Sequence, residues 1–349
     1  MTLYQQQLYS IISASIPWAK LYDKTVMISG ATGMIGRCLT DVLMLKNHED
    51  GSNIRILALS RNEKRARECF AKYWDDEKFI YISCDVNDAI PDIGAADYII
   101  HAASNTHPVQ YSKEPIGTIA SNVFGTKNLL DYAVTHGKGR FCFISSVEIY
   151  GENRGDVEKF TEDYMGYIDC NTLRAGYPEG KRLGETLCNA YKQSYDLDFV
   201  IPRLSRIYGP TMIPSDSKAI SQFIKKAAAG EDIILKSEGN QRYSYTFVTD
   251  AVSGILYALL SGESGEAYNI ANGESDIALK DLAEKLADIA HTKVVYEVPD
   301  ETERKGYSAA TKAMLDASKL KKLGWNPNVV MSEGLGCTVL TFRQILKDM

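Results

Sequence analysis

TVMISGATGMIG, residues 25–36, is the stretch that decides the fold of this chain. It opens on a short apolar run, which predicts a buried strand, and the pattern that follows it is helical. Three glycines, Gly30, Gly33 and Gly36, lie between strand and helix. Glycine lets the backbone turn sharply and approach a pyrophosphate without a Cβ in the way, and a helix N-terminus offers free N–H groups to an anion. Together these features predict a dinucleotide-binding turn.

Outward from this turn, short apolar runs alternate with helical patterns. Because strands that alternate with helices imply βαβ crossovers, we expect an α/β fold built on a Rossmann-like, doubly wound parallel sheet. Ligands should bind at the carboxyl ends of its strands. The further strands expected are Ile54–Leu59, Phe79–Ser83, Tyr98–His101, Arg140–Ser145 and Phe199–Pro202, with helices at Asn62–Tyr73 and Ile119–Thr135 among those between them.

The chain divides into three expected regions. Residues 1–23 place apolar side chains at helical spacing, which predicts an amphipathic helical extension that packs on the main fold, with partner binding as the alternative. Residues 24–205 hold the predicted dinucleotide-binding Rossmann domain. From 206 to 349 the periodicity loosens and turn signals cluster. We expect there a smaller α+β lobe that binds substrate, with a strand able to return to the main sheet.

The composition argues against several classes of protein. A net charge of −6 gives no broad attraction to nucleic acid or anionic membranes. The 7 cysteines are odd in number and form no Cys-x-x-Cys pair, which indicates a reducing compartment rather than a disulfide framework or a zinc site. The 5 histidines show no ligand spacing, so no metal is expected. No stretch approaches the roughly 20 apolar residues that span a bilayer, and we expect a cytoplasmic protein.

The end of the second strand bears on the choice of cofactor. An acidic residue at this point holds the 2′-hydroxyl of the adenosine ribose, whereas an arginine accommodates a 2′-phosphate. This chain has Arg61 after Ser60, with Lys64 close by and no acid before Glu63. NAD(P) is therefore the expected cofactor, with NADP slightly favoured over NAD. A solvated basic face at the start of a helix is the alternative interpretation.

Tyr177 and Lys181 are the candidate catalytic pair. Four residues apart, they share one face of a helix, and Pro178 suits a first helical turn. A tyrosine titrates near pH 10, but a lysine and an oxidised nicotinamide nearby both favour the phenolate. Tyr177 can then take the proton of a substrate hydroxyl while hydride leaves to the nicotinamide. Ser146 ends a predicted strand, where it can hydrogen-bond the reacting oxygen or simply satisfy a local turn.

In their order along the chain, these motifs resemble those of the extended short-chain dehydrogenases/reductases, a family of nucleotide-sugar epimerases, dehydratases and decarboxylases. The resemblance runs from about Lys24 to about Pro327. It implies a nucleoside-diphosphate sugar as substrate and a homodimer. It also implies that Tyr177 is the base, that Lys181 holds the nicotinamide ribose, and that Ser146 positions the oxygen. The residues expected at the cofactor are Gly30, Thr32, Gly33, Met34, Ile35, Gly36, Ser60, Arg61, Asp85, Val86, Ala102, Ala103, Ser104, Asn122, Ser145, Tyr177 and Lys181.

Several positions depart from the family pattern. Arg206 stands where many relatives have asparagine before Tyr-Gly-Pro, and Arg174 lies in an unusual segment just before the catalytic tyrosine. Arg206 can bind a substrate phosphate or carboxylate or merely form a salt bridge, and Arg174 is a further candidate for binding a substrate anion. Where relatives place an arginine on the diphosphate, this chain has Tyr243, with Arg242 one residue earlier and so on the other face of a strand unless a bulge intervenes. His107, in a loop, is a further candidate for substrate contact.

Glu148 bears on the reaction. Relatives that eliminate water or decarboxylate a glucuronate carry a glutamate here, where it can act as a base at sugar C5 once C4 is oxidised. Val147 cannot protonate a departing C6 hydroxyl, which disfavours a 4,6-dehydratase. We therefore expect oxidation at C4 by an epimerase or a UDP-glucuronate-decarboxylase-like enzyme. A 4,6-dehydratase or 4-keto reductase and, in another class, a non-catalytic NADP-binding regulator are the alternatives. Glu148 itself has a second interpretation, as a charge at the pocket rim.

Overall fold

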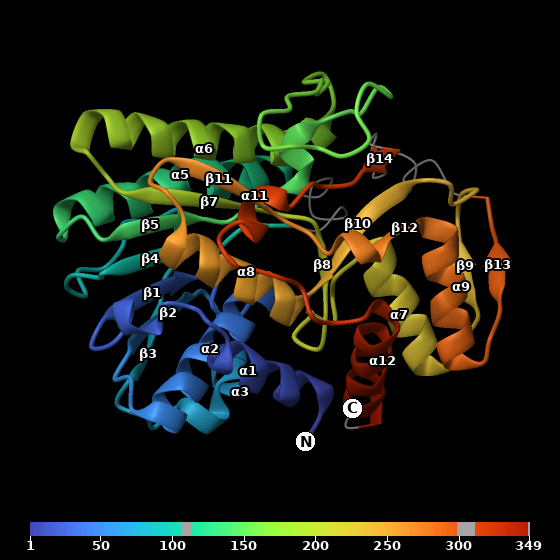
Figure 1. The fold of residues 1–349 in the computed structure, drawn as a ribbon, viewed down its shortest axis with the longest axis horizontal. Helices are drawn as coiled ribbons and strands as arrows, with labels where there is room; N and C mark the ends of the chain where they lie inside the picture. The colour runs from blue at the N-terminus through green and yellow to red at the C-terminus, as the bar shows by residue number, and fades with distance from the viewer. Residues whose placement is uncertain (107–113, 299–310, 348–349) are drawn as a thin grey trace.

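A parallel sheet forms the centre of the molecule (Figure 1). The computed structural model describes residues 1–106, 114–298 and 311–347. The main path of the sheet runs β11-β7-β5-β4-β1-β2-β3, and the short β6 pairs with β7. All its pairings are parallel, which confirms the doubly wound Rossmann-like fold. Its strands are β1 Thr25–Ser29, β2 Arg55–Ser60, β3 Phe79–Ser83, β4 Tyr98–His101, β5 Arg140–Phe143, β6 Ser145–Ser146, β7 Phe199–Leu204 and β11 Glu266–Ile270.

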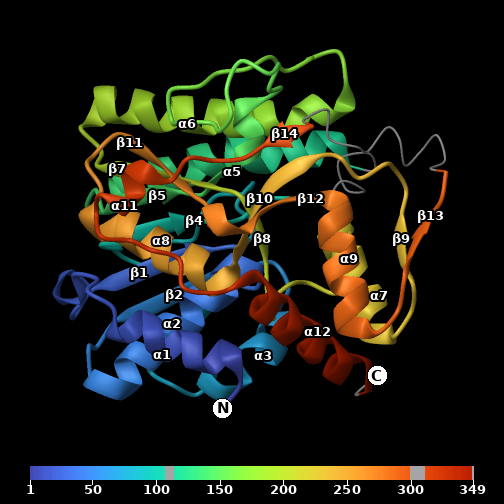
Figure 2. The same cartoon turned by 45° about the vertical axis from the view of Figure 1, so that its right-hand side comes forward.

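Helices cover both faces of this sheet, as Figures 1 and 2 show. The pair α5 and α6 packs over one face, while α1, α2 and α8 cover the other. Strand order reverses between β1 and β4, so the ligand crevice of such a sheet opens beside the glycine turn that follows β1. The helices are α1 Leu3–Ser13, α2 Met34–Asp50, α3 Glu63–Cys69, α5 Pro115–Thr135, α6 Gly176–Tyr195 and α8 Val248–Ser261, with 3-10 turns at Trp18–Lys20 and Ala71–Tyr73.

The remaining elements form a lobe beside the carboxyl end of the main sheet (Figure 2). The chain leaves the main sheet after β7 and enters the lobe at once, because only Ser205 separates β7 from β8. It later returns, and β11 pairs with β7. The lobe comprises β8 Arg206–Tyr208, β9 Ile233–Leu235, β10 Arg242–Phe247, β12 Asp276–Ala278, β13 Val294–Tyr296, β14 Lys312–Ala313, α7 Ala219–Ala229, α9 Leu279–Ala290, α12 Met331–Lys347 and the 3-10 turn Gly273–Ser275. The short helix α11 Ser318–Lys321 packs instead against β11 and α8 of the main fold.

The N-terminal extension is part of the packed structure. Helix α1 begins with a capping box between Thr2 and Gln5 and buries Leu8, Ile11 and Ile12. It packs against α2, α8 and α12, so it contacts both the main fold and the lobe. Removing its apolar face from water stabilises this junction by roughly 1.5–3 kcal/mol per buried side chain.

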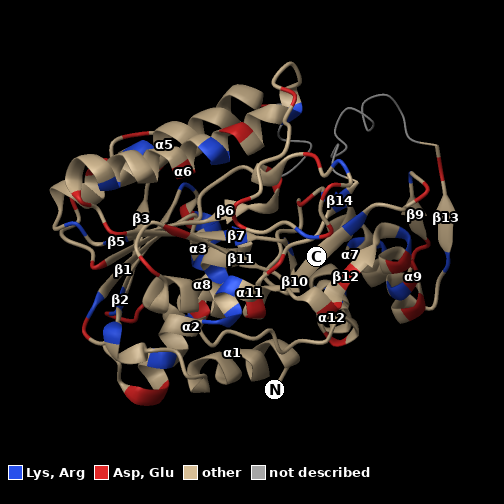
Figure 3. Ribbon diagram, turned by 45° about the horizontal axis from the view of Figure 1, so that its top comes forward, with Lys and Arg blue, Asp and Glu red and all other residues tan. Residues whose placement is uncertain are grey.

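Several element boundaries differ from the sequence-based expectation. The strand expected over 140–145 breaks at Ile144, whose carbonyl oxygen accepts a hydrogen bond from Lys181 at 2.8 Å instead of continuing the ladder. The helix expected over 62–73 ends at Cys69 and continues only as the short 3-10 turn. Acidic and basic residues are interspersed along the ribbon (Figure 3). Within the described residues, no helix is long and apolar enough to cross a membrane.

Candidate active site

The glycine turn forms a tight cradle at the end of β1. Gly30 has a φ of +69°, and a Cβ there would lie 2.7 Å from the backbone nitrogen of Ala103. A Cβ on Gly36 would lie 2.4 Å from the carbonyl oxygen of Gly30. Helix α2 begins directly afterwards, at Met34, and no side chain caps its N-terminus. The turn therefore leaves backbone N–H groups accessible to an anion, as the pyrophosphate of NAD requires.

The ends of the neighbouring strands lie at the same edge of the sheet as this cradle, where a doubly wound sheet binds its ligand. Ser60 at the end of β2 has a buried hydroxyl without a hydrogen-bond partner in the described part of the chain, in the place where a ribose hydroxyl would bind. Asn122 on α5 is buried, and its amide oxygen accepts a hydrogen bond from Ser104 at 2.8 Å. The other expected cofactor residues line the same strand ends and turns: Thr32, Gly33, Ile35, Asp85, Val86, Ala102 and Ala103.

Ser145 differs from the expected cofactor contact. Its side chain is buried, and its hydroxyl donates to the carboxylate of Glu185 at 2.5 Å. The hydroxyl is thus already engaged behind the strand end. The next residue, Ser146, is partly exposed and begins the 3-10 turn Val147–Tyr150. Alternation along the strand explains why the two serines face opposite sides.

The structure brings Ser146, Tyr177 and Lys181 together. Tyr177 lies in the first turn of α6, and its phenol shares a hydrogen bond with the side chain of Ser146. Lys181 lies one turn further along α6 and is 2% exposed. Its ammonium group donates to the carbonyl oxygen of Ile144 and lies 4.6 Å from the centre of the Phe143 ring. Hydroxyl, phenol and ammonium thus converge on the carboxyl end of β5 and β6.

Burial dominates the electrostatics of this pair. It raises the pKa of Tyr177 to about 12, while the hydrogen bond from Ser146 lowers it. The carboxylate of Glu148 also raises the pKa of Tyr177, and the guanidinium of Arg174 lowers it. Burial lowers the pKa of Lys181 to about 7. Arg174 therefore provides a cationic influence on Tyr177 that the sequence pattern did not reveal.

A second charged group lies beside the phenol. The Glu148 carboxylate accepts a hydrogen bond from Nη2 of Arg174 at 2.9 Å, and Nη2 of Arg206 lies 3.8 Å from its other oxygen. The guanidinium of Arg206 stacks on the Tyr243 ring, with its carbon 3.8 Å from the ring centre. Burial raises the pKa of Glu148, but Arg174, Arg206 and then Lys218 outweigh it, so the net shift is downward. Glu148 is therefore ionised at neutral pH.

Arg242, another sequence candidate, lies apart from this cluster. Arg242 is exposed, whereas the next residue, Tyr243, is buried and faces Arg206, so the two side chains lie on opposite faces of β10. His107 lies outside the described residues. Lys218, which sequence reasoning missed, donates to Thr106 at 3.2 Å and to Asp216 at 3.1 Å, and its charge reaches Glu148. Its loop offers no motif that would have singled it out.

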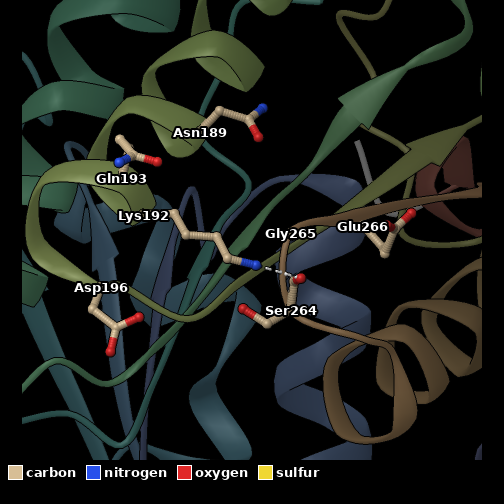
Figure 4. A pocket seen from close by; sticks show the side chains of 7 residues that line it. All are labelled: Asn189, Lys192, Gln193, Asp196, Ser264, Gly265 and Glu266. Carbon is tan, nitrogen blue, oxygen red and sulfur yellow. Dashed lines mark hydrogen bonds between the residues drawn. The ribbon is translucent and has the colours of Figure 1, made fainter.

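A surface depression lies at the other end of α6 (Figure 4). Lys192 projects across it and donates to the carbonyl oxygen of Ser264 at 2.6 Å. At about 1.5 Å per helical residue, Lys192 lies more than about 20 Å along α6 from Tyr177. It therefore does not belong to the catalytic cluster. No group of three or more potential ligands for a metal ion occurs among the described residues.

Most of the chain matches a known protein family. Residues 26–271 match the model of the NAD dependent epimerase/dehydratase family. The chain belongs to this family. It is an enzyme family, and the match covers the glycine turn, the candidate catalytic residues and the start of the lobe.

Relatives within the family include several decarboxylases. The chain is 30% identical to UDP-glucuronic acid decarboxylase 1 of Danio rerio, over 93% of this chain and 74% of the relative. It is 31% identical to UDP-glucuronic acid decarboxylase 3 of Arabidopsis thaliana, over 91% of this chain and 89% of the relative. The fold also matches a dTDP-glucose 4,6-dehydratase from Streptomyces venezuelae solved with NAD, with a TM-score of 0.79, 26% identity and coverage of 92% and 97% of the two chains.

These comparisons support NAD as the cofactor of the family and give no support to the slight preference for NADP. That preference rested on Arg61. In the structure, Nη1 of Arg61 lies 3.4 Å from the carboxylate of Asp85. A 2′-phosphate bound by Arg61 would therefore meet a negative charge, which disfavours its binding.

We expect Gly36→Ala to weaken NAD binding at least about tenfold, because the added methyl group collides with the backbone of the cradle and must distort it. Titration with NAD, followed by calorimetry, measures the effect. Gly336→Ala is the matched control, since nothing lies within 4 Å of a Cβ at that helical position. Equal NAD affinity in Gly36→Ala and the unaltered protein would show that the turn does not hold the cofactor.

Proposed function

We propose that this protein decarboxylates a nucleotide-linked uronic acid, with UDP-glucuronate as the expected substrate, through oxidation at sugar C4. The main support is the position of Arg174 and Arg206, which converge on one carboxylate beside Ser146 and Tyr177. Two guanidinium groups in a partly buried site suit a substrate carboxylate, because arginine binds carboxylates through paired hydrogen bonds. The decarboxylases of about 30% identity support the same reaction.

The first step removes a proton from the C4 hydroxyl. Ser146 hydrogen-bonds the C4 oxygen and Tyr177 accepts its proton, while Lys181 holds the ribose beside the nicotinamide. NAD, when bound, accepts the hydride from C4 and later returns it. Burial opposes formation of the Tyr177 phenolate by raising its pKa, and the charge of Glu148 adds to this effect. The hydrogen bond with Ser146 and the charge of Arg174 lower the pKa and so favour the phenolate.

The C4 ketone makes the sugar a β-keto acid. The bond between C5 and C6 then breaks, carbon dioxide leaves, and the electron pair moves into the enolate formed by C5, C4 and the C4 oxygen. Ser146 and Tyr177 stabilise the negative charge on that oxygen. Arg206 has a buried Nε without a hydrogen-bond partner among the described residues, which leaves it a donor for the substrate carboxylate before the bond breaks.

The product forms when C5 takes up a proton from solvent and hydride returns to C4, with the Tyr177 proton returning to the C4 oxygen. The lowered pKa of Glu148 makes it a poor proton donor at neutral pH. We assign it to the ionised state, as a base or as an anchor for the two arginines. Val147 is buried and apolar, so it provides no acid for a departing C6 hydroxyl. This disfavours a 4,6-dehydratase.

Mass spectrometry of the purified protein with UDP-glucuronate and NAD tests the proposal. Loss of the mass of carbon dioxide is the expected result, and UDP-glucose, which lacks the carboxylate, should stay unchanged. A product of unchanged mass but altered stereochemistry would instead identify a 4-epimerase. A parallel reaction with NADP in place of NAD should be slower. Consumption of UDP-glucose with loss of water would contradict both the substrate class and the role of Val147.

We also propose that two copies of the chain pair through α5 and α6. These helices expose Ile116, Phe124 and Leu183, at 82%, 58% and 45%. Phe124→Lys places a charge on this surface and should halve the mass measured by light scattering at micromolar concentration. Leu340→Lys, on the exposed side of α12, is the matched control and should not change the mass. A monomeric unaltered protein, or two variants that behave alike, would contradict the pairing.

A further inference from the structure

A buried carboxylate lies behind the catalytic cluster without touching the substrate site. Glu185 follows Lys181 by one turn of α6 and is 7% exposed. Besides the hydroxyl of Ser145, its oxygens accept two hydrogen bonds from Arg203, from Nε at 3.1 Å and Nη2 at 2.6 Å. A carboxylate so deeply placed is costly unless it is paired and fully hydrogen-bonded, as it is here.

Arg203 connects this carboxylate to residues on neighbouring segments of the main fold. Its Nη1 donates to the carbonyl oxygen of Glu162 at 2.6 Å and to the hydroxyl of Tyr150 at 3.1 Å. Tyr150 in turn donates to the side-chain oxygen of Asn269 on β11 at 2.6 Å. The network therefore joins α6 to β6, β7 and β11, which fixes the place of Lys181 relative to the strands.

The charge of Glu185 also acts on Lys181. Lys181 is buried, and burial lowers its pKa to about 7, whereas Glu185 and then Cys188 raise it. The other ionisable groups whose charge interacts with the ammonium are Cys188 on the same helix and His101 on β4. Burial, and then the charge of Lys181, lower the pKa of His101 well below its usual range, so His101 is neutral. Glu185 is thus the carboxylate that acts on the ammonium from one turn along the same helix.

We propose that Glu185 is a positioning residue that keeps Lys181 in its ammonium form and, through Ser145, fixes the strand end that carries Ser146. The effect of Glu185 on turnover rests on the proposed function, because Lys181 is the residue assigned there to the nicotinamide ribose. The effect of Glu185 on NAD binding can be measured without any sugar substrate. The two can therefore be tested separately.

The test is the pH dependence of NAD binding to the full chain. An ammonium binds ribose hydroxyls better than a neutral amine, so NAD affinity should fall as pH rises through the pKa of Lys181, near pH 7. In Glu185→Gln, which keeps the shape but removes the charge, this midpoint should move down by about one pH unit. The Lys181→Met variant should lose the midpoint altogether. Adding Glu185→Gln to Lys181→Met should then cause no further pH effect.

A merely structural role predicts a different pattern. Glu185→Gln would then unfold at a lower temperature and keep the midpoint of the unaltered protein, which would overturn the proposal. So would a midpoint that survives in Lys181→Met. If removal of one partner prevents folding, Glu185→Gln combined with Arg203→Met replaces both buried charges and leaves neither unpaired. The lowered midpoint is expected in this double variant too, and an unchanged one would refute the role of Glu185. Failure to convert UDP-glucuronate would affect only the proposed function.

Discussion

Tyr177→Phe should lower turnover of UDP-glucuronate by about 10²- to 10⁴-fold and leave NAD affinity within about twofold of the unaltered protein. The substitution removes the hydroxyl that exchanges the proton with the C4 oxygen. It leaves the ring, which is 5% exposed and packed at the start of α6, so the fold should persist. Stopped-flow absorbance of the reduced nicotinamide, with a separate NAD titration, measures both quantities.

Tyr195→Phe is the matched control, because this tyrosine lies on the same helix, is 48% exposed and stands far from the strand ends. It should turn over normally. Unchanged turnover in Tyr177→Phe would remove Tyr177 from the reaction and revive a role as a nucleotide-binding regulator. Loss of NAD binding along with turnover would show that the phenol is needed to hold the cofactor, contrary to its assignment as the proton acceptor.

Arg206→Met should lower kcat/KM for UDP-glucuronate by about 10- to 100-fold, since a hydrogen bond to a charged group contributes about 1.5–3 kcal/mol. The side chain of Arg206 is 21% exposed and stacks on the ring of Tyr243, which holds its guanidinium group in place. Binding of UDP-glucose, which has no carboxylate, should change little. Arg206→Lys keeps the charge but lacks the paired donors. Its kcat/KM for UDP-glucuronate should therefore fall between the values of Arg206→Met and the unaltered protein.

Steady-state kinetics with UDP-glucuronate and competition by UDP-glucose make this comparison. Arg55→Met, at the opposite end of β2 from Ser60, serves as the surface control. An equal loss of affinity for both sugars would place Arg206 on the nucleotide diphosphate instead of on the carboxylate. No effect on either would leave it as a structural partner of Glu148.

The fold followed from local sequence signals. Buried parallel strands are short continuous apolar runs, and glycines at fixed spacing mark the turn, so the strands from Thr25 to Leu204 and their parallel pairing could be predicted. The order of Ser146, Tyr177 and Lys181 along the chain also pointed to the cluster that the structure brings together.

Contacts between distant segments could not be predicted in the same way. Nothing in the sequence pattern showed that Arg174 and Arg206 share the carboxylate of Glu148, because the three residues come from separate turns and strands. The slight preference for NADP rested on Arg61 alone, and the sequence did not show that Arg61 pairs with Asp85 at the end of a different strand. Charges in sequence show only which residues can pair, and tertiary structure decides which do.

The single-residue passage from β7 to β8 through Ser205 has a consequence for how this protein unfolds. The main sheet and the lobe share a continuous strand path, a returning strand in β11, and the helix α1 that packs on both. A cut between them would expose apolar surface on each side. Calorimetry should therefore record one cooperative melting transition, and neither half should be obtainable as a stable fragment.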